Sequence, residues 1–234
     1  MDIFGRALLD YQKGIYVDDI KTFSSLDEAD TMALPYLFRN YGEMPQIEQK
    51  ALQLCRGSVL DIGCGAGSHS LYLQSKNIPV TALDSSKGAI ETCKRRGVKS
   101  TQNCSIQDFK NQKFDTLLLL MNGIGIVGKL KFLKFYLDHF KSLLSPNGQI
   151  LLDSSDIIYM FDADKDGSYT FPKSRDYYGE VEFTMRYNGE TSNLFSWLYL
   201  DYNTLQHIAS NCQFECELVS EGNHYDYLAR LTYK

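Results

Sequence analysis

The chain has 234 residues, with 24 Lys and Arg against 29 Asp and Glu, and its formal net charge is −5. This length is typical of one α/β domain with room for an insertion. The longest basic run is Lys94-Arg95-Arg96, too short to form the stripe that meets nucleic-acid phosphates, so we expect a small-molecule substrate and no nucleic-acid partner. The longest apolar run, Leu117–Met121, is far below the roughly 20 residues of a membrane span, and residues 1–10 have no apolar stretch of signal-peptide length. The sequence therefore indicates a cytoplasmic protein that does not enter a membrane.

The six cysteines form neither a disulfide framework nor a zinc-binding motif. None of their spacings is C-x-x-C, and Cys212 and Cys216 have no matching cluster of His or Cys residues. A chain of this length can build its own hydrophobic core without covalent cross-links. We therefore expect no metal site and reduced, mostly packed thiols at Cys55, Cys64, Cys93, Cys104, Cys212 and Cys216.

Residues 1–56 have the pattern of a helical cap. Apolar residues between Phe4 and Tyr11 are compatible with a short amphipathic helix, and Ser24–Glu28, with serines before acids, is typical of a helix start. A further helix is expected over Gln46–Cys55, where apolar residues recur at helical spacing and Gly57 ends the pattern.

Ser58–Ile62 is a short apolar segment with β-branched residues, typical of a central parallel strand covered on both faces. Gly63, Gly65 and Gly67 follow at alternate positions, where the missing Cβ atoms allow positive φ angles and let a ligand lie against bare peptide groups. A helix beginning at Ser68 then directs its free N–H groups toward this turn. A strand, a glycine turn and a helix form the general nucleotide site of doubly wound folds.

The glycine spacing separates the kinds of nucleotide site. A dinucleotide fingerprint, G-x-G-x-x-G, would require glycine where Ser68 stands, and no Gly-Lys-Ser/Thr follows for a triphosphate. Pro79–Asp84 is a second strand that ends in an acid, and a carboxylate at that end of a doubly wound sheet can accept both hydroxyls of a ribose. The alternative is a glycine turn that only closes a βα unit, with Asp84 as the N-cap of the next helix.

Three further strands and two helices continue the alternation. We expect helices over 86–96 and 129–144, the second with one broad apolar face, and strands over 98–102, 114–121 and 149–153. Asn122 and Gly123 stand at the carboxyl end of the 114–121 strand, where doubly wound folds carry their chemistry.

The string Asp61-x-Gly63-x-Gly65-x-Gly67 resembles motif I of the class I S-adenosylmethionine (SAM) dependent methyltransferases. The resemblance covers residues 57–156 and implies an α/β fold with a doubly wound, mostly parallel seven-stranded sheet. It also implies SAM as the cofactor and S-adenosyl-L-homocysteine (SAH) as its product. A helix capped by Asn203 or Thr204 and ending at Asn211, followed by strands over 214–219 and 225–232, fits the family by element order, with the last strand antiparallel.

The resemblance assigns roles to loop residues. Asp61 would order the glycine turn and the methionine amino group, Asp84 would hold the ribose, and Asp108 would accept a hydrogen bond from the adenine amino group. Met121 and Asn122 would border the transferred methyl. Arg39 or Tyr36 would meet the methionine carboxylate or line the acceptor site, unless these side chains only pack the cap. The predicted cofactor contacts are Arg39, Asp61, Gly63, Cys64, Gly65, Gly67, Asp84, Ser85, Gln107, Asp108, Phe109, Met121 and Asn122.

The segment after the fifth strand is predicted to be an insertion. Asp162–Gly167 imitates the start of a calcium-binding EF-hand loop, but the twelfth position is Lys173 rather than an acid, so we interpret it as an exposed acidic turn. The alternation over 177–201 around Asn188-Gly189 predicts a β-hairpin. The resemblance implies that an insertion at this place, between the fifth strand and the last helix, covers the substrate. One domain is then divided into the helical cap (1–56), the SAM-binding core (57–156), the hairpin insertion (157–201) and a C-terminal helix with two strands (202–234).

The sequence thus predicts methyl transfer from SAM to a small-molecule O, N or C nucleophile by in-line displacement, with positioning as the main catalytic effect. No catalytic residue is assigned, because His69, Tyr11, Tyr36 and Asp153 are candidate bases by position only. In amino-group methyltransferases acting on DNA or glutamine, the motif at Asn122 reads D/N-P-P-Y/F, which is absent here. A SAM-binding module without activity and a nicotinamide-dependent oxidoreductase remain as alternatives, the second disfavoured by Ser68.

Overall fold

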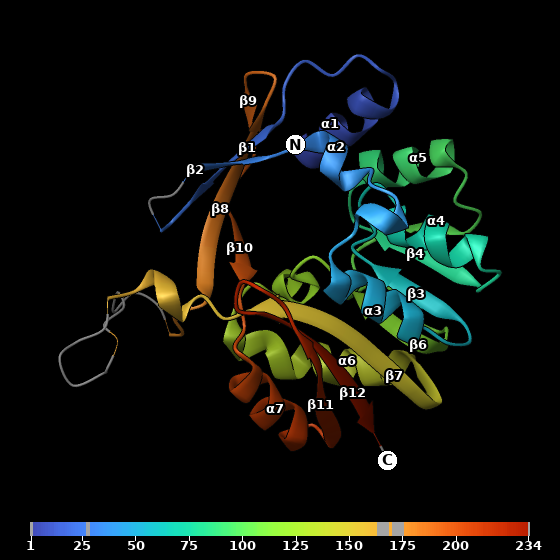
Figure 1. The fold of residues 1–234 in the computed structure, drawn as a ribbon, viewed down its shortest axis with the longest axis vertical. Helices are drawn as coiled ribbons and strands as arrows, with labels where there is room; N and C mark the ends of the chain where they lie inside the picture. The colour runs from blue at the N-terminus through green and yellow to red at the C-terminus, as the bar shows by residue number, and fades with distance from the viewer. Residues whose placement is uncertain (1, 27–28, 163–168, 170–175, 234) are drawn as a thin grey trace.

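The computed structural model describes residues 2–26, 29–162, 169 and 176–233, and its centre is a seven-stranded sheet (Figure 1). The strand order is β11-β12-β7-β6-β3-β4-β5. Strands β3 to β7 pair in parallel, whereas β12 is antiparallel to both β7 and β11. This arrangement confirms the predicted doubly wound, mostly parallel sheet with an antiparallel last strand. The strands are β3 (Val59–Ile62), β4 (Val80–Asp84), β5 (Thr101–Asn103), β6 (Phe114–Leu119), β7 (Leu144–Ser155), β11 (Phe214–Glu221) and β12 (Asp226–Tyr233).

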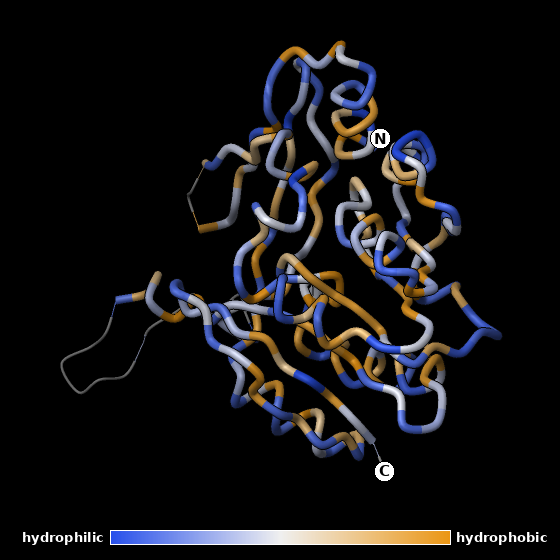
Figure 2. The backbone as a smooth tube through the Cα atoms, turned by 45° about the vertical axis from the view of Figure 1, so that its right-hand side comes forward, coloured by the Kyte–Doolittle hydropathy of each residue, from blue (hydrophilic) through white to orange (hydrophobic). Residues whose placement is uncertain are grey.

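Helices cover both faces of this sheet because successive strand residues point to opposite sides. Leu60, Leu117 and Ile150 pack in one hydrophobic cluster with α6 (Leu133–Leu143) and α7 (Tyr202–Asn211). Their neighbours Val59, Leu118 and Leu151 pack in a second cluster with α3 (Gln46–Leu54) and α4 (Ser68–Ser75). The fifth core helix is α5 (Lys87–Arg96), which packs on β4 and β5. In Figure 2 most of the hydrophobic stretches lie inside the molecule, and the hydrophilic ones lie mainly in peripheral turns and helices.

A second, antiparallel sheet corrects the prediction of a helical cap over residues 1–56, because β1 and β2 lie in this region. Its order is β10-β8-β1-β2, with β9 paired to β8, so segments from the cap and the insertion lie side by side (Figure 1). We refer to it as the cap sheet. Its strands are β1 (Ile20–Ser24), β2 (Ala29–Met32), β8 (Glu180–Tyr187), β9 (Glu190–Thr191) and β10 (Phe195–Leu198). The helix start predicted at Ser24–Glu28 is wrong at its described residues, because β8 offers β1 a partner strand, with Lys21 opposite Arg186.

The hairpin predicted around Asn188-Gly189 is confirmed, since β8 and β9 flank a turn in which both residues have positive φ. Besides α3, the helical part of the cap consists of α1 (Ile3–Gln12), α2 (Leu34–Leu37) and the short 3₁₀ turn η1 (Tyr41–Glu43). Further 3₁₀ turns are η2 (Gly123–Val127), η3 (Leu130–Phe132) and η4 (Ile158–Met160). The cap and the insertion, predicted as separate parts, therefore share one sheet.

Several helices and strands begin at residues other than those predicted. The third strand begins at Thr101 rather than at 98, and the helix expected from 129 starts as η3 before α6. The N-cap of α7 is Asp201, whose carboxylate accepts from the Thr204 N–H at 2.9 Å, rather than Asn203 or Thr204. Of the acidic turn Asp162–Gly167, positions 163–167 lie outside the described residues.

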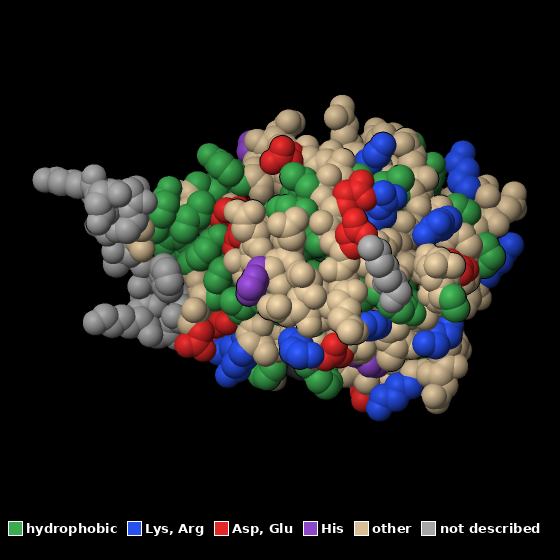
Figure 3. Space-filling model, turned by 90° about the horizontal axis from the view of Figure 1, so that it is seen from below, with side chains coloured by type: hydrophobic (Ala, Val, Ile, Leu, Met, Phe, Trp, Pro, Cys, Tyr) green, Lys and Arg blue, Asp and Glu red, His purple; other side chains and the backbone are tan. Residues whose placement is uncertain are grey.

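The cysteines, possible metal ligands and surface charges were further subjects of the sequence predictions. All six cysteines are free thiols. Among the described residues no group of three or more His, Cys, Asp or Glu is placed to hold a metal ion, and no helix is long and apolar enough to cross a membrane. On the face seen from below, acidic and basic side chains are interspersed (Figure 3).

Candidate active site

The glycine turn between β3 and α4 forms an open cradle. Gly63, Gly65 and Gly67 have φ angles of 75°, 52° and 81°, which a residue with a Cβ rarely adopts. The N–H groups of Gly63 and Cys64 donate to the carbonyl of Leu83 at 2.9 and 3.1 Å and tie the turn to the end of β4. A Cβ placed on Gly63 would meet no protein atom within 4 Å, so the cradle leaves room for a ligand at this position.

Asp84 ends β4 beside this turn. One of its carboxylate oxygens accepts from the Gly65 N–H at 3.0 Å, and the other accepts from the Ser86 N–H at 2.8 Å. A carboxylate offers about four acceptor positions, so about two remain for the hydroxyls of a ribose. Burial raises the pKa of Asp84, and the two backbone donors partly offset this effect. The adjacent Ser85 is exposed.

Asp61 lies below the turn and is almost fully buried. Its carboxylate accepts from the hydroxyl of Ser70 at 2.6 Å and therefore holds the first turn of α4 against β3. Burial raises the pKa of Asp61, while the neighbouring His69 and Ser70 act in the opposite direction.

The loop after β6 is held by a second buried carboxylate. Met121 and Asn122 have positive φ angles of 65° and 54°. The Asp153 carboxylate accepts from the N–H groups of Met121 at 3.0 Å and Gly123 at 3.1 Å. Burial raises the pKa of Asp153 to about 7, with a contribution from the negative charge of Glu48. Asp153 thus anchors a strained turn, whereas its position in the sequence indicated only a candidate base.

The side chain of Asn122 connects this loop to the cap sheet. Its amide nitrogen donates to the carbonyl of Leu198 in β10 at 3.1 Å, and its oxygen accepts from the Ser154 hydroxyl at 2.7 Å. The same hydroxyl accepts from the Leu200 N–H at 2.9 Å. The position of the β6 loop therefore depends on both sheets.

A buried ion network lies between the cap and α4. Nη2 of Arg39 is 2.5 Å from both carboxylate oxygens of Glu48, and Nε2 of His69 is 2.7 Å from Oε2 of the same carboxylate. Burial alone would raise the pKa of Glu48, but His69 and Arg39 together hold it below its ordinary value. The Arg39 guanidinium stacks on Tyr36 at 4.0 Å from the ring centroid. Nε of Arg39 is the one buried side-chain polar atom without a hydrogen bond in the described part of the chain.

Comparison with known proteins identifies the family of this fold and site. A profile of the methyltransferase domain family matches residues 59–148. The crystal structure of a SAM-dependent methyltransferase from Bacteroides fragilis, in complex with SAH, is 41% identical in sequence and has a TM-score of 0.91 to this chain. The match covers 99% of this chain and 94% of that one. The chain belongs to the SAM-dependent methyltransferase family.

More distant structures share the fold of this methyltransferase. A sugar N-methyltransferase from Streptoalloteichus is 13% identical with a TM-score of 0.58, and the match covers 80% of this chain and 85% of that one. A SAM-bound amino pentose methyltransferase from Micromonospora echinaspora is 14% identical with a TM-score of 0.57, covering 80% and 89%. No curated protein matches the sequence. SAM is the cofactor of this methyltransferase, and the open cradle beside Asp84 fits it.

The residues predicted for the adenine side of the methyltransferase lie in different environments. Asp108 is exposed and accepts from the Ser105 hydroxyl at 2.7 Å, and the exposed Gln107 donates to the hydroxyl of Tyr136. The Phe109 side chain is buried in the core with Phe114, so a contact of Phe109 with the cofactor would use its backbone. The Cys64 side chain is also buried, with its Sγ 3.7 Å from Sγ of Cys93. A contact of Cys64 with the cofactor would therefore use its backbone.

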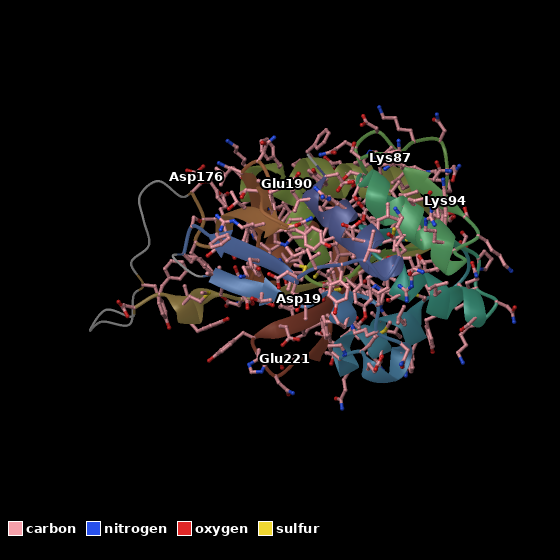
Figure 4. The ribbon with its side chains drawn as sticks, turned by 90° about the horizontal axis from the view of Figure 1, so that it is seen from above. Asp19, Lys87, Lys94, Asp176, Glu190 and Glu221 are labelled. Carbon is pink, nitrogen blue, oxygen red and sulfur yellow. The ribbon has the colours of Figure 1, made fainter. Side chains whose placement is uncertain are left out.

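The helix α1 lies beside the glycine cradle, a position that the sequence did not predict. The nearest atoms to a Cβ built on Gly65 belong to the Phe4 ring, at 3.7 and 3.9 Å. Asp2 accepts from the Gly5 N–H at 2.9 Å and from the Gly88 N–H at 3.0 Å, so it caps α1 and also holds the start of α5. Seen from above, Lys87 and Lys94 mark α5 beside this helix (Figure 4). The ion pair of Arg6 with Glu190 at 2.5 Å joins α1 to the cap sheet.

The close crossing of α1 and α5 leads to a first prediction. A Cβ on Gly88 would run into the backbone of Gly5, so Gly88→Ala must push the two helices apart. We expect it to lower the free energy of unfolding of the methyltransferase by about 1–3 kcal/mol, measured by urea denaturation. Gly42→Ala is the matched control, since its Cβ would meet only one atom, at 3.4 Å. Equal stability of the two variants would contradict the tight crossing.

Proposed function

We propose that the enzyme transfers the SAM methyl group to a small-molecule nucleophile bound beside the contact between the β6 loop and the cap sheet. The observation that carries this proposal is the contact of β10 with η2, the turn that begins directly after Asn122. The indole of Trp197 lies so close to Gly125 that a Cβ on this glycine would clash with it. An aromatic surface of the cap sheet therefore lies next to the loop predicted to border the methyl group.

The face of the cap sheet that carries Trp197 is largely apolar. The strand register places Phe195 opposite Phe183, and Trp197 opposite Val181, so these four side chains share one face. Phe183, Phe195 and Trp197 are only half-buried by the protein itself, and Phe183 stacks on Phe195 at 6.0 Å. Such a surface supports an acceptor with an apolar or ring-shaped part, because a ligand would remove aromatic area from water.

The four candidate bases differ in their surroundings. His69 is bound to Glu48, and Asp153 holds the β6 loop. The Tyr11 ring packs in the cap, with its centroid 4.5 Å from that of Phe38 and 4.8 Å from that of Tyr16. Tyr36 is 45% exposed. The sulfonium of SAM supplies an already activated methyl group, so these residues support a mechanism in which the protein orients the reactants and excludes water.

The test of the acceptor class is a turnover screen. The purified protein is incubated with SAM and a panel of small amines, phenols, alcohols and carbon acids, and SAH release is measured against a reaction without acceptor. We expect release with a subset of these compounds, and no release from the Asp84→Ala variant, which lacks the proposed ribose ligand. Turnover only with a protein or nucleic-acid fraction would contradict a small-molecule acceptor.

The cradle itself gives a second prediction, on Gly63→Ala. The φ of Gly63 is 75° and that of Gly189 is 76°, and a Cβ at either position would meet no protein atom within 4 Å. The backbone strain should therefore be equal in the two variants, about 1–2 kcal/mol of stability. We expect Gly63→Ala alone to weaken SAM binding, by about tenfold or more, because its methyl group would occupy ligand space. Equal SAM affinity of Gly63→Ala and Gly189→Ala, measured by calorimetry, would contradict this placement of the cofactor.

A further inference from the structure

Two carboxylates near the carboxyl ends of two interior strands of the core sheet are buried. Asp61 in β3 is 2% exposed and Asp153 in β7 is 7% exposed. Across the described ranges no salt bridge reaches either of them. Burying an unpaired carboxylate is costly, so a site that keeps two of them is suited to a ligand that brings positive charge.

The groups that face Asp153 form no ion pair with it in the described part of the chain. The negative charge of Glu48 in α3 raises the pKa of Asp153 and His69 in α4 lowers it, and Asp153 in turn acts on Tyr36 of α2 and Tyr227 of β12. The Arg39 guanidinium, which stacks on Tyr36, forms an ion pair with Glu48 at 2.5 Å. The charges of Arg39 and Glu48 therefore cancel. The remaining contacts of the Asp153 carboxylate are the N–H groups of Met121 and Gly123. They fix its orientation and carry no net charge.

The chemistry of the cofactor matches two such carboxylates. SAM carries two cationic groups, the α-ammonium of its methionine part and the sulfonium, whereas SAH has lost the sulfonium charge. We propose that the Asp153 carboxylate is the counter-charge of the sulfonium, so that this methyltransferase binds SAM more tightly than SAH. The inference rests on the proposed placement of SAM along the ends of β3 and β6, with Asp61 near the ammonium.

The size of the effect follows from the charges. Two unit charges about 5 Å apart interact by about 3 kcal/mol at an effective dielectric constant of about 20, and desolvation removes part of this. We therefore expect ionised Asp153 to favour SAM over SAH by about tenfold. Transfer of the methyl group would abolish the attraction, which favours release of SAH.

The test measures the affinities of SAM and SAH by calorimetry at about pH 6 and about pH 8, on either side of the pKa of about 7 of Asp153. Below this pKa Asp153 is protonated and neutral, and above it the carboxylate is charged. The ratio of SAM to SAH affinity should thus rise roughly fivefold between the two pH values. Because SAM favours the charged form, its binding near neutral pH should also release more protons than SAH binding, seen as a dependence of the heat on the buffer.

Two variants test whether Asp153 causes the pH dependence of the ratio of SAM to SAH affinity. Asp153→Asn should lower the ratio and remove its pH dependence, whereas Asp61→Asn should weaken SAM and SAH equally and leave the ratio unchanged. A parent ratio that does not change with pH, or an unchanged pH dependence in Asp153→Asn, would overturn the inference. These outcomes presuppose that the parent binds SAM, so a folded parent that binds neither ligand would instead contradict the proposed function. The parent measurements do not depend on the folding of either variant.

Discussion

Replacing Asp84 by Ala should weaken SAM binding by about 30- to 1000-fold, which corresponds to roughly 2–4 kcal/mol. The proposed reason is the loss of a half-buried acceptor for two ribose hydroxyls. The side chain also holds the turn through the N–H groups of Gly65 and Ser86, so the variant removes the group that orients the cradle. Calorimetric titration of parent and variant with SAM measures the difference.

The matched control is Asp138→Ala on α6. Asp138 is exposed and, among the residues that the structure describes, pairs only with Lys134 on its own helix, so its loss should leave SAM affinity unchanged. Thermal unfolding of each variant separates a binding defect from a folding defect. A folded Asp84→Ala protein with the affinity of the parent would contradict the assignment of Asp84 to the ribose.

Replacing Glu48 by Gln should have the largest effect on stability. The variant leaves the Arg39 guanidinium buried and uncompensated, and breaking such a pair costs about 3–5 kcal/mol. Because the pKa of Glu48 is lowered in the folded protein, this stabilisation is present above the ordinary pKa of about 4.3. It is lost as the pH falls through the folded value, so parent and variant should converge in acid. Urea denaturation at neutral and acidic pH measures both effects.

Glu91→Gln is the control for this prediction. Glu91 forms an exposed pair with Arg95 one turn along α5, at 2.9 Å, and such pairs contribute about 0.3–0.5 kcal/mol. If Glu48→Gln destabilised the protein no more than Glu91→Gln, the Arg39–Glu48–His69 network would have no structural role.

Most of the core sheet could be predicted because its signals are local. The glycines after β3 require unusual backbone angles, and the strands are short apolar runs that end in polar residues. The cap sheet could not be predicted in this way, since β1 becomes a strand by pairing with β8, a partner far away in the sequence. The serine and acid pattern after Thr22 favours a helix locally, and the tertiary pairing overrides it.

The distinction between local signals and contacts with distant segments also applies to the site. The placement of Asp84 beside Gly63 and Gly65 could be predicted, because their spacing and strand positions carry the information. Glu48 was not singled out, although an acid next to Ile47 and four residues before Leu52 on an otherwise apolar helix face is a signal of a buried charge. Its partners come from other elements, so its role as the link between Arg39 and His69 is visible only in the fold.

The most direct test of the account is the titration of the parent protein with SAM, by calorimetry and by the shift of the thermal unfolding midpoint. We expect one site with an affinity in about the micromolar range, and a midpoint that rises with SAM concentration because the ligand binds only the folded state. A folded protein that gives neither heat nor a midpoint shift would contradict the assignment of the glycine cradle and Asp84 to SAM.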